Sequence, residues 1–213
     1  MDNYKIYPNV RIGKGASIGD YVIIGYPPRG KEPGELETII GDNAVIRAHS
    51  VIYAGNVIGD NLQTGIMAVL RESNTVGNNV SIGTQCGLEH HIEIGDNVRM
   101  QGQVGIAEYT VLEEGCWLGP RVITTNVFHP LCPKAKECLK GPTIKRRAII
   151  GANVTLYPRV VVGERALVGA GCVVMRDVPP YAVLTAKPSK VIDNIFKLTC
   201  PFGLIDRPYR EDD

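Results

Sequence analysis

The sequence has few aromatic residues, no long apolar run and almost no net charge, and each shortage excludes a class of protein. Aromatic side chains make up 6% of the 213 residues, too few for the stacking platforms that bind single-stranded nucleic acid. The formal net charge of +1 provides no basic footprint for nucleic acid. No apolar run reaches the roughly 20 residues that a membrane helix needs. We therefore expect neither nucleic acid nor a membrane as a partner.

The first residues, MDNYKIYPNV, lack the basic and apolar regions of a secretory signal, so we expect a cytoplasmic protein. In that compartment the six cysteines are expected to be thiols or metal ligands rather than disulfides. Glycine, in contrast, is abundant, with 24 residues that recur at regular places.

A period of six residues runs through most of the chain. From Ile40 an apolar residue returns at every sixth position as far as Leu118, and Thr64 is the one exception in that series. Blocks with the same period begin at Ile6 and Ile144, and a small residue often stands four positions after the apolar one. A helix would repeat its apolar face every 3.6 residues, so a period of six indicates three short strands per turn of a solenoid.

The hexads predict one all-β domain over residues 1–192, a parallel β-helix of about eight coils. Two segments rich in Pro, Gly and Lys break the period at 27–37 and 127–142, and we expect both to be loops. A C-terminal tail, 193–213, follows, and the segment KVIDNIFKL before and within it is expected to form a short helix.

Three polar residues share one position of the repeat. His90, Glu108 and Asn126 are spaced by three hexads, so stacked coils would place them above one another at about the 4.8 Å strand spacing. An imidazole can take a proton near neutral pH, a carboxylate can orient it, and an amide can hold a substrate oxygen. This column is our candidate catalytic centre. The alternative is a solvated ladder that only stabilises adjacent coils.

Further candidates surround the column. Glu89 and His91 flank His90 in LEHHIE, and either histidine could be the one that works. The second loop has the spacing H-x2-C-x5-C, which could supply a structural zinc with three ligands, although free thiols or a disulfide would also explain its cysteines. The three zinc candidates are His129, Cys132 and Cys138.

Four segments sharpen the pattern: LEEGCWLGP at 112–120, ITTN at 123–126, the run 149–183, and AKPSKVI at 186–192. With the hexad motif, they resemble the hexapeptide-repeat acyltransferases, which are left-handed β-helices, and best of all the subgroup that acetylates amino groups of nucleotide-linked sugars. The resemblance implies a small-molecule acceptor, acetyl-CoA as donor and co-substrate, a homotrimer, and active sites between subunits.

The same resemblance suggests where substrates bind. Gln103 stands nearest to an asparagine of the family pattern, and Arg71 could meet a sugar-nucleotide pyrophosphate. Basic residues near the last coils suit the phosphates of coenzyme A, and small residues there could receive its pantetheine arm. These coenzyme candidates are Arg146, Arg165, Lys187, Lys190, Gly151, Ala152, Gly169 and Ala170.

Two other functions stay open at this point. Such solenoids also serve as non-catalytic binding or assembly subunits, because a fold does not dictate a function. A zinc enzyme of the carbonic-anhydrase kind would need three histidines around one metal, and this sequence has only four histidines in all.

Overall fold

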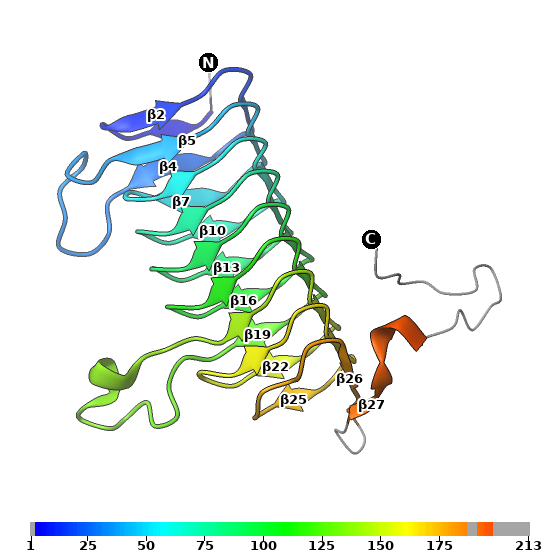
Figure 1. Cartoon of the computed structure of the whole chain (residues 1–213). Coiled ribbons are helices and arrows are strands. Elements are labelled where there is room, and N and C mark those ends of the chain that lie inside the picture. Colours follow the sequence, from blue (N-terminus) through cyan, green and yellow to red (C-terminus); the bar gives the residue numbers. More distant parts are fainter. Residues whose placement is uncertain (1–2, 187–190, 198–213) are drawn as a thin grey trace.

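The computed structural model describes residues 3–186 and 191–197, which form a three-sided prism of stacked coils (Figure 1). Successive strands of the chain enter three different sheets in turn, and every strand of the stack pairs in parallel with the strand one coil later. Val69 pairs with Gly87, and Gly87 with Gly105, so residues 18 apart lie side by side as predicted. The fold is the left-handed parallel β-helix that the hexads and the resemblance indicated.

The three sheets hold nine, eight and ten strands in the described part of the chain, and we name them I, II and III. Sheet I contains β1 (Lys5–Ile6), β4 (Ile23–Tyr26), β7 (Val51–Tyr53), β10 (Val69–Leu70), β13 (Gly87–Leu88), β16 (Gly105–Ile106), β19 (Ile123–Thr124), β22 (Thr155–Leu156) and β25 (Val173–Val174). Sheet II contains β2 (Val10–Ile12), β5 (Thr38–Ile40), β8 (Val57–Ile58), β11 (Thr75–Val76), β14 (Glu93–Ile94), β17 (Val111–Leu112), β20 (Thr143–Ile144) and β23 (Val161–Val162). Sheet III contains β3 (Ser17–Ile18), β6 (Val45–Ile46), β9 (Gln63–Thr64), β12 (Ser81–Ile82), β15 (Arg99–Met100), β18 (Trp117–Leu118), β21 (Ile149–Ile150), β24 (Leu167–Val168), β26 (Ala182–Leu184) and β27 (Val191–Asn194).

The core is the column of apolar residues that the period marks. Leu70, Leu88 and Ile106 are buried one above another inside the prism, and small residues such as Cys86 fill its corners. The exception, Thr64, is buried as well, and its hydroxyl oxygen accepts a hydrogen bond from the Arg47 amide over 2.9 Å. A buried hydroxyl costs free energy unless it is paired, so this bond explains why the series tolerates a threonine.

The corners of the prism use left-handed backbone at one position of nearly every hexad. Asparagine and glycine, which tolerate this conformation best, occupy only part of these places. His91 (φ 56°), Tyr109 (φ 58°) and Arg121 (φ 60°) take the same conformation. Such residues adopt it at a cost of roughly 1–2 kcal/mol, which the hydrogen bonds between coils offset.

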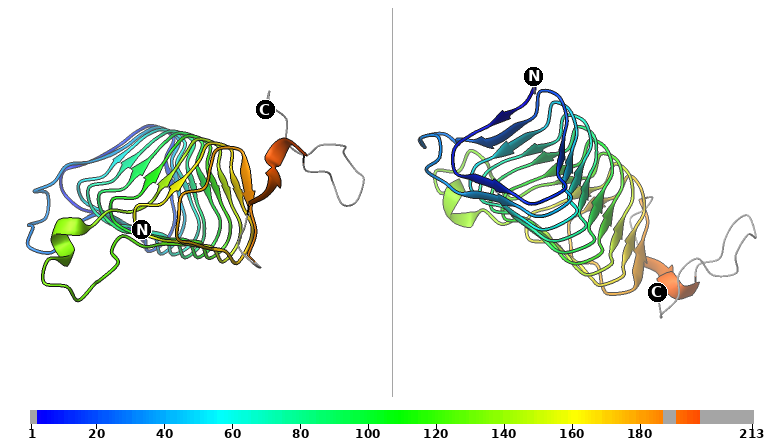
Figure 2. Two further views of the ribbon diagram at one scale, coloured as in Figure 1. Left: turned by 60° about the horizontal axis from the view of Figure 1, so that its bottom comes forward. Right: turned by 90° about the horizontal axis from the view of Figure 1, so that it is seen from above.

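Both predicted loops leave the prism at the same corner. Residues 27–37 connect β4 to β5, and residues 125–142 connect β19 to β20 and include the 3₁₀-helix η1 (Ala135–Cys138). Each therefore passes from sheet I to sheet II, and the blue and green loops project on one side in Figures 1 and 2. Between the two loops, the turns that connect sheet I to sheet II lie along the same corner, which we call the loop-flanked corner.

The tail differs from the expectation. Val191–Asn194 is a strand, β27, which pairs antiparallel with β26, and only one 3₁₀ turn follows, η2 (Ile195–Lys197). The β-branched Val191 suits a strand, and β26 offers an unpaired edge, so sheet pairing prevails over a helix at this point. No helix of the described residues is long and apolar enough to span a bilayer.

Candidate active site

The predicted polar column exists at the loop-flanked corner. His90 Nε2 lies 2.8 Å from Glu108 Oε1, and the amide nitrogen of Asn126 donates to Glu108 Oε2 over 3.0 Å. The His90 and Glu108 side chains are 20% and 22% exposed, so they are sheltered yet open to a substrate. The register alone brings together three side chains that the sequence separates by 18 residues.

A fourth member of the column, Glu72, was missed in the sequence although it stands 18 residues before His90. Burial opposes its ionisation, but its own backbone amide, the guanidinium of Arg71 and the charge of His90 outweigh burial and lower the pKa of Glu72. Its side chain is only 14% exposed. The 18-residue spacing was the signal that would have revealed it, and His90 is consequently placed between two carboxylates.

Arg71, a predicted substrate-binding residue, is occupied by protein carboxylates. Its Nη2 lies 2.8 Å from Glu72, and its Nη1 lies 2.8 Å from Glu89, the other predicted neighbour. With both partners ionised, the guanidinium charge is more than balanced. In the structure Arg71 therefore braces Glu72 and Glu89, and its contact with a pyrophosphate stays a prediction.

His91 contacts the column from the side, through His90. Its Nδ1 lies 2.8 Å from Nδ1 of His90, so the two imidazoles share one hydrogen bond. The ring of Tyr109 packs against both, with centroids 5.5 Å from His91 and 6.0 Å from His90. His91 is exposed while His90 is half-buried, so His91 forms the outer end of the cluster.

Buried threonines hold the turn that carries Glu108. Thr124 Oγ1 accepts from the Ala107 amide over 2.7 Å, and the Thr110 hydroxyl donates to the Ala107 carbonyl over 2.7 Å. At the root of the second loop, the Lys140 amide donates to the Asn126 carbonyl over 2.9 Å. The coil below and the loop root thus fix both ends of the Glu108–Asn126 pair.

Gln103 lies at another corner of the prism, in the turn from sheet III to sheet I. Its amide nitrogen donates to Gln85 over 3.0 Å, and Arg121 Nε donates to its oxygen over 2.7 Å. Within one chain it does not join His90.

The coenzyme candidates occupy the corners away from His90. Gly151, Ala152, Gly169 and Ala170 lie in turns from sheet III to sheet I, where the amides of the two glycines already donate to Val168 and Leu184 carbonyls over 2.7 and 2.8 Å. Those two amides are therefore occupied within the chain, and the contact of these four residues with a pantetheine arm stays a prediction. Lys187 and Lys190 fall outside the described residues.

Arg146 and Arg165 lie at the third corner, between sheets II and III. They line a pocket of about 460 Å³ together with Glu164, Tyr181, Asn194 and Phe196. Arg146 pairs with Glu164 over 2.8 Å, and the guanidinium of Arg165 lies 6.0 Å from the Phe196 ring centre. Both lie near the last coils, the Glu164 carboxylate balances one of the two charges, and their contact with coenzyme A stays a prediction.

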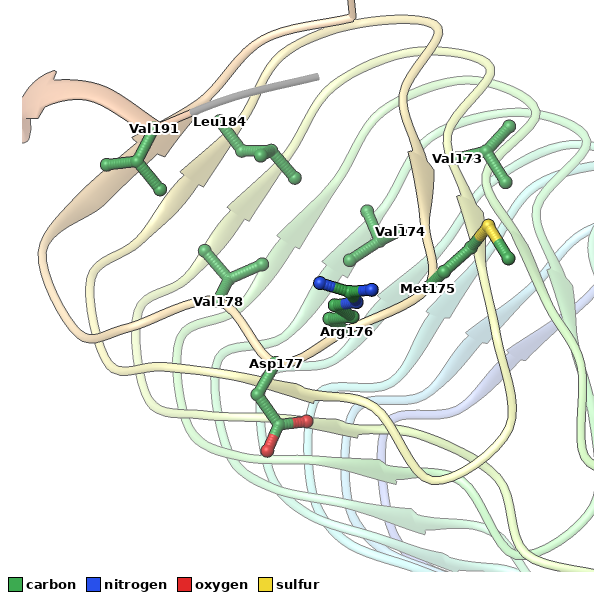
Figure 3. A pocket seen from close by; sticks show the side chains of 8 residues that line it. All are labelled: Val173, Val174, Met175, Arg176, Asp177, Val178, Leu184 and Val191. Atoms are coloured by element: carbon green, nitrogen blue, oxygen red, sulfur yellow. The ribbon is translucent and has the colours of Figure 1, made fainter. Parts of the chain in front are cut away.

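A second pocket, of about 370 Å³, opens at the carboxyl end of the prism (Figure 3). Val174, Val178, Leu184 and Val191 give it an apolar wall, Arg176 lies among these side chains, and Asp177 also lines it. It forms where the last coil has no further coil to cover it. It is separate from the column, which follows β13 in the middle of the stack.

The zinc expectation for the second loop is not supported. The Cys132 amide donates to the His129 carbonyl, but the described residues contain no group of three or more His, Cys, Asp or Glu placed to hold a metal ion. Cys132 and Cys138 are exposed free thiols, and the Cys138 thiol lies 3.3 Å from the Ala135 carbonyl. The 3₁₀ turn gives the Cys138 thiol a carbonyl partner, and the H-x2-C-x5-C spacing did not by itself indicate a metal site. Neither does the described part offer a three-histidine site of the carbonic-anhydrase kind.

Known proteins resemble parts of this chain. Residues 141–176 match the family described as bacterial transferase hexapeptide (six repeats). A dTDP-3-amino-3,6-dideoxy-α-D-galactopyranose 3-N-acetyltransferase of Aneurinibacillus thermoaerophilus is 38% identical over 63 residues, which cover 30% of this chain and 33% of that protein. The galactoside O-acetyltransferase of Escherichia coli is 32% identical over 95 residues, which cover 42% of this chain and 47% of that protein. The matches thus span about a third to a half of these curated relatives.

Solved structures agree with the fold. A UDP-N-acetylglucosamine acyltransferase from Francisella novicida superposes with a TM-score of 0.68 at 20% identity, over 87% of this chain and 67% of the other. The corresponding protein of Bacteroides fragilis gives a TM-score of 0.61 at 21% identity, over 89% and 72%. At these identities the likeness concerns the β-helix alone.

Proposed function

We propose that this chain, a member of the hexapeptide-repeat acyltransferase family, transfers an acetyl group from acetyl-CoA to an amino group of a nucleotide-linked amino sugar. One observation carries the proposal. A half-buried histidine, His90, is hydrogen-bonded to Glu108, and Asn126 fixes that carboxylate at the root of a loop. A rigid scaffold meets a long loop there, which is where catalytic groups commonly lie.

The reaction needs a base more than anything else. The ammonium form of the acceptor first loses one proton to solvent. As the neutral amine nitrogen then bonds to the thioester carbon, it must give up a second proton, and the carbon–sulfur bond breaks. The charge of that proton comes to rest on His90, where Glu108 and Glu72 stabilise an imidazolium. The proton is later returned to the sulfur of coenzyme A. Asn126 acts on this step by holding Glu108.

The charge of the corner favours an amine as acceptor. Glu72, Glu89 and Glu108 outnumber the single guanidinium of Arg71, so the surface attracts a cationic ammonium group and repels a diphosphate. We therefore place the acceptor's amino group at the column and its phosphates away from Arg71. The similarity to a sugar N-acetyltransferase supports the same class of acceptor.

The distribution of residues over corners supports a shared site. The coenzyme candidates and Gln103 lie on corners that the same chain cannot bring to His90, so a second chain would have to supply them. We propose a homotrimer for this reason and from the family resemblance. A solution mass of one chain, 23.1 kDa, for fully active protein would contradict it.

Thiol release from acetyl-CoA across matched acceptors tests the function. We expect release to rise with nucleotide-linked amino sugars, and not with the same sugars carrying a hydroxyl in place of the amine. The acetylated product should be identified by mass. If no amino sugar nucleotide raises release above the rate without acceptor, the proposed acceptor class is wrong.

A further inference from the structure

The imidazoles of His90 and His91 form a pair that the proposed reaction does not by itself require. Both ring nitrogens of His90 are already bonded, Nε2 to Glu108 and Nδ1 to His91. No nitrogen of His90 is thus open to an acceptor amine. Nε2 of His91 has no hydrogen-bond partner among the described residues, and the His91 side chain is exposed.

The Glu108 carboxylate determines which ring nitrogens of His90 and His91 carry a hydrogen. An ionised carboxylate only accepts hydrogen bonds, so Nε2 of His90 must carry the hydrogen toward Glu108. A neutral imidazole has one N–H, so Nδ1 of His90 is then a lone pair. The bond between the two Nδ1 atoms therefore requires the hydrogen on His91, which leaves the lone pair of His91 on Nε2.

We propose that Glu108, His90 and His91 form a proton relay in which His91 Nε2 is the atom that meets the acceptor amine. This inference rests on the proposed acetyl transfer. His91 is then the catalytic residue, and His90 and Glu108 set its tautomer and hold the charge. The amine gives its proton to His91 Nε2, and the Nδ1 proton of His91 passes to Nδ1 of His90.

The atoms and charges balance along this path. A bond forms between the amine nitrogen and the acetyl carbon, the carbon–sulfur bond breaks, and the positive charge resides on His90 between Glu72 and Glu108. The relay then runs in reverse, and His91 Nε2 protonates the departing thiolate to give the free thiol of coenzyme A. No other reactant is needed.

Two local features hold His91 for this role. Its backbone is left-handed, at φ 56°, and its amide hydrogen points to the Glu72 carbonyl over 3.4 Å. The Tyr109 ring lies 5.5 Å away at a tilt of 32°, so it restricts rotation of the imidazole. The half-buried His90 lies behind His91 and Tyr109. In the proposed relay, the positive charge resides on this shielded ring.

Nitrogen NMR of the full chain labelled with ¹⁵N-histidine tests the relay without any substrate. Imidazole nitrogen shifts separate N–H from lone pair, and His91→Ala assigns the signals. We expect N–H at His90 Nε2 and His91 Nδ1, with a scalar coupling between the two Nδ1 atoms. The opposite tautomer on both rings, or no coupling with both Nδ1 atoms protonated, overturns the proposal.

Kinetics then separates the relay from the function. With an acceptor that wild type acetylates, His91→Ala should lower kcat about 10²-fold or more, at least as much as His90→Ala. His49→Ala, which removes a histidine from the same left-handed position at another corner, should leave kcat unchanged. A large loss for His90→Ala with His91→Ala near wild type contradicts the relay but leaves acetyl transfer intact. A wild type without acetyl transfer defeats the proposed function, and the NMR still decides the tautomers.

Discussion

Glu72 shows how one residue ties stability to the candidate site. Its carboxylate is nearly buried, braced by Arg71 and adjacent to His90 in the column, and its pKa is lowered below the ordinary value of 4.5. A group with a depressed folded-state pKa stabilises the protein above its unfolded pKa. That contribution disappears as the pH falls through the folded-state pKa.

We therefore expect Glu72→Gln to lower the free energy of unfolding by about 1–2 kcal/mol at about pH 7. The deficit relative to wild type should shrink as the pH falls below 4.5, because wild type loses the same contribution there. Denaturant unfolding of both proteins at about pH 7 and about pH 3 measures the difference. An equal deficit at the two values would show that Glu72 acts through packing alone.

At the scale of single residues, the sequence predicted where each backbone lies better than which side chains contact each other. The 18-residue register was enough to stack His90, Glu108 and Asn126, because the period fixes where each backbone lies. It could not predict that Arg71 would turn toward two carboxylates, or that His90 and His91 would share a hydrogen bond. Those outcomes depend on side-chain rotamers, which the period does not determine.

The stacking of coils depends on glycine where one turn lies over the next. A Cβ at Gly83 would stand 2.4 Å from the backbone of Gln101 in the following coil, whereas a Cβ at Gly87 would meet nothing within 4 Å. Position 83 therefore excludes any side chain, whereas position 87 has room for one.

We expect Gly83→Ala to lower the free energy of unfolding by about 1–3 kcal/mol, since a backbone must shift to admit the methyl group. Gly87→Ala, four residues away, is the matched control and should be neutral or slightly stabilising. Thermal and denaturant unfolding of the two variants give the comparison. Equal stability of both would mean that the coils do not approach as closely as the structure indicates.

Elements with a strict period were predictable, and those without one were not. The loops at 27–37 and 127–142 interrupt the hexads visibly, so their places were clear. The segment after Leu184 has no period, and its outcome as strand and single 3₁₀ turn depended on the open edge of β26. The loop spacing H-x2-C-x5-C suggested a zinc site. Spacing alone carries no information on how His129 and Cys138 are oriented, so this prediction could not be reliable.

At the scale of the whole molecule, the prism places candidate residues of different predicted roles at different corners. The loop-flanked corner carries the column from Glu72 to Asn126, while the corners at Gln103 and at Arg146 carry the remaining candidates. A three-sided solenoid keeps these corners apart in one chain. In the proposed homotrimer, donor and acceptor would meet where corners of neighbouring chains come together.

The most direct test of the column as the catalytic centre is the kcat/KM for acetyl transfer of Glu108→Gln. The change keeps the shape of the side chain and removes the charge that pairs with His90. We predict a fall of about 10²-fold or more with little change in thermal stability, while Glu114→Gln, at an exposed glutamate of another turn, stays at wild type. A Glu108→Gln enzyme within a few-fold of wild type would contradict the account.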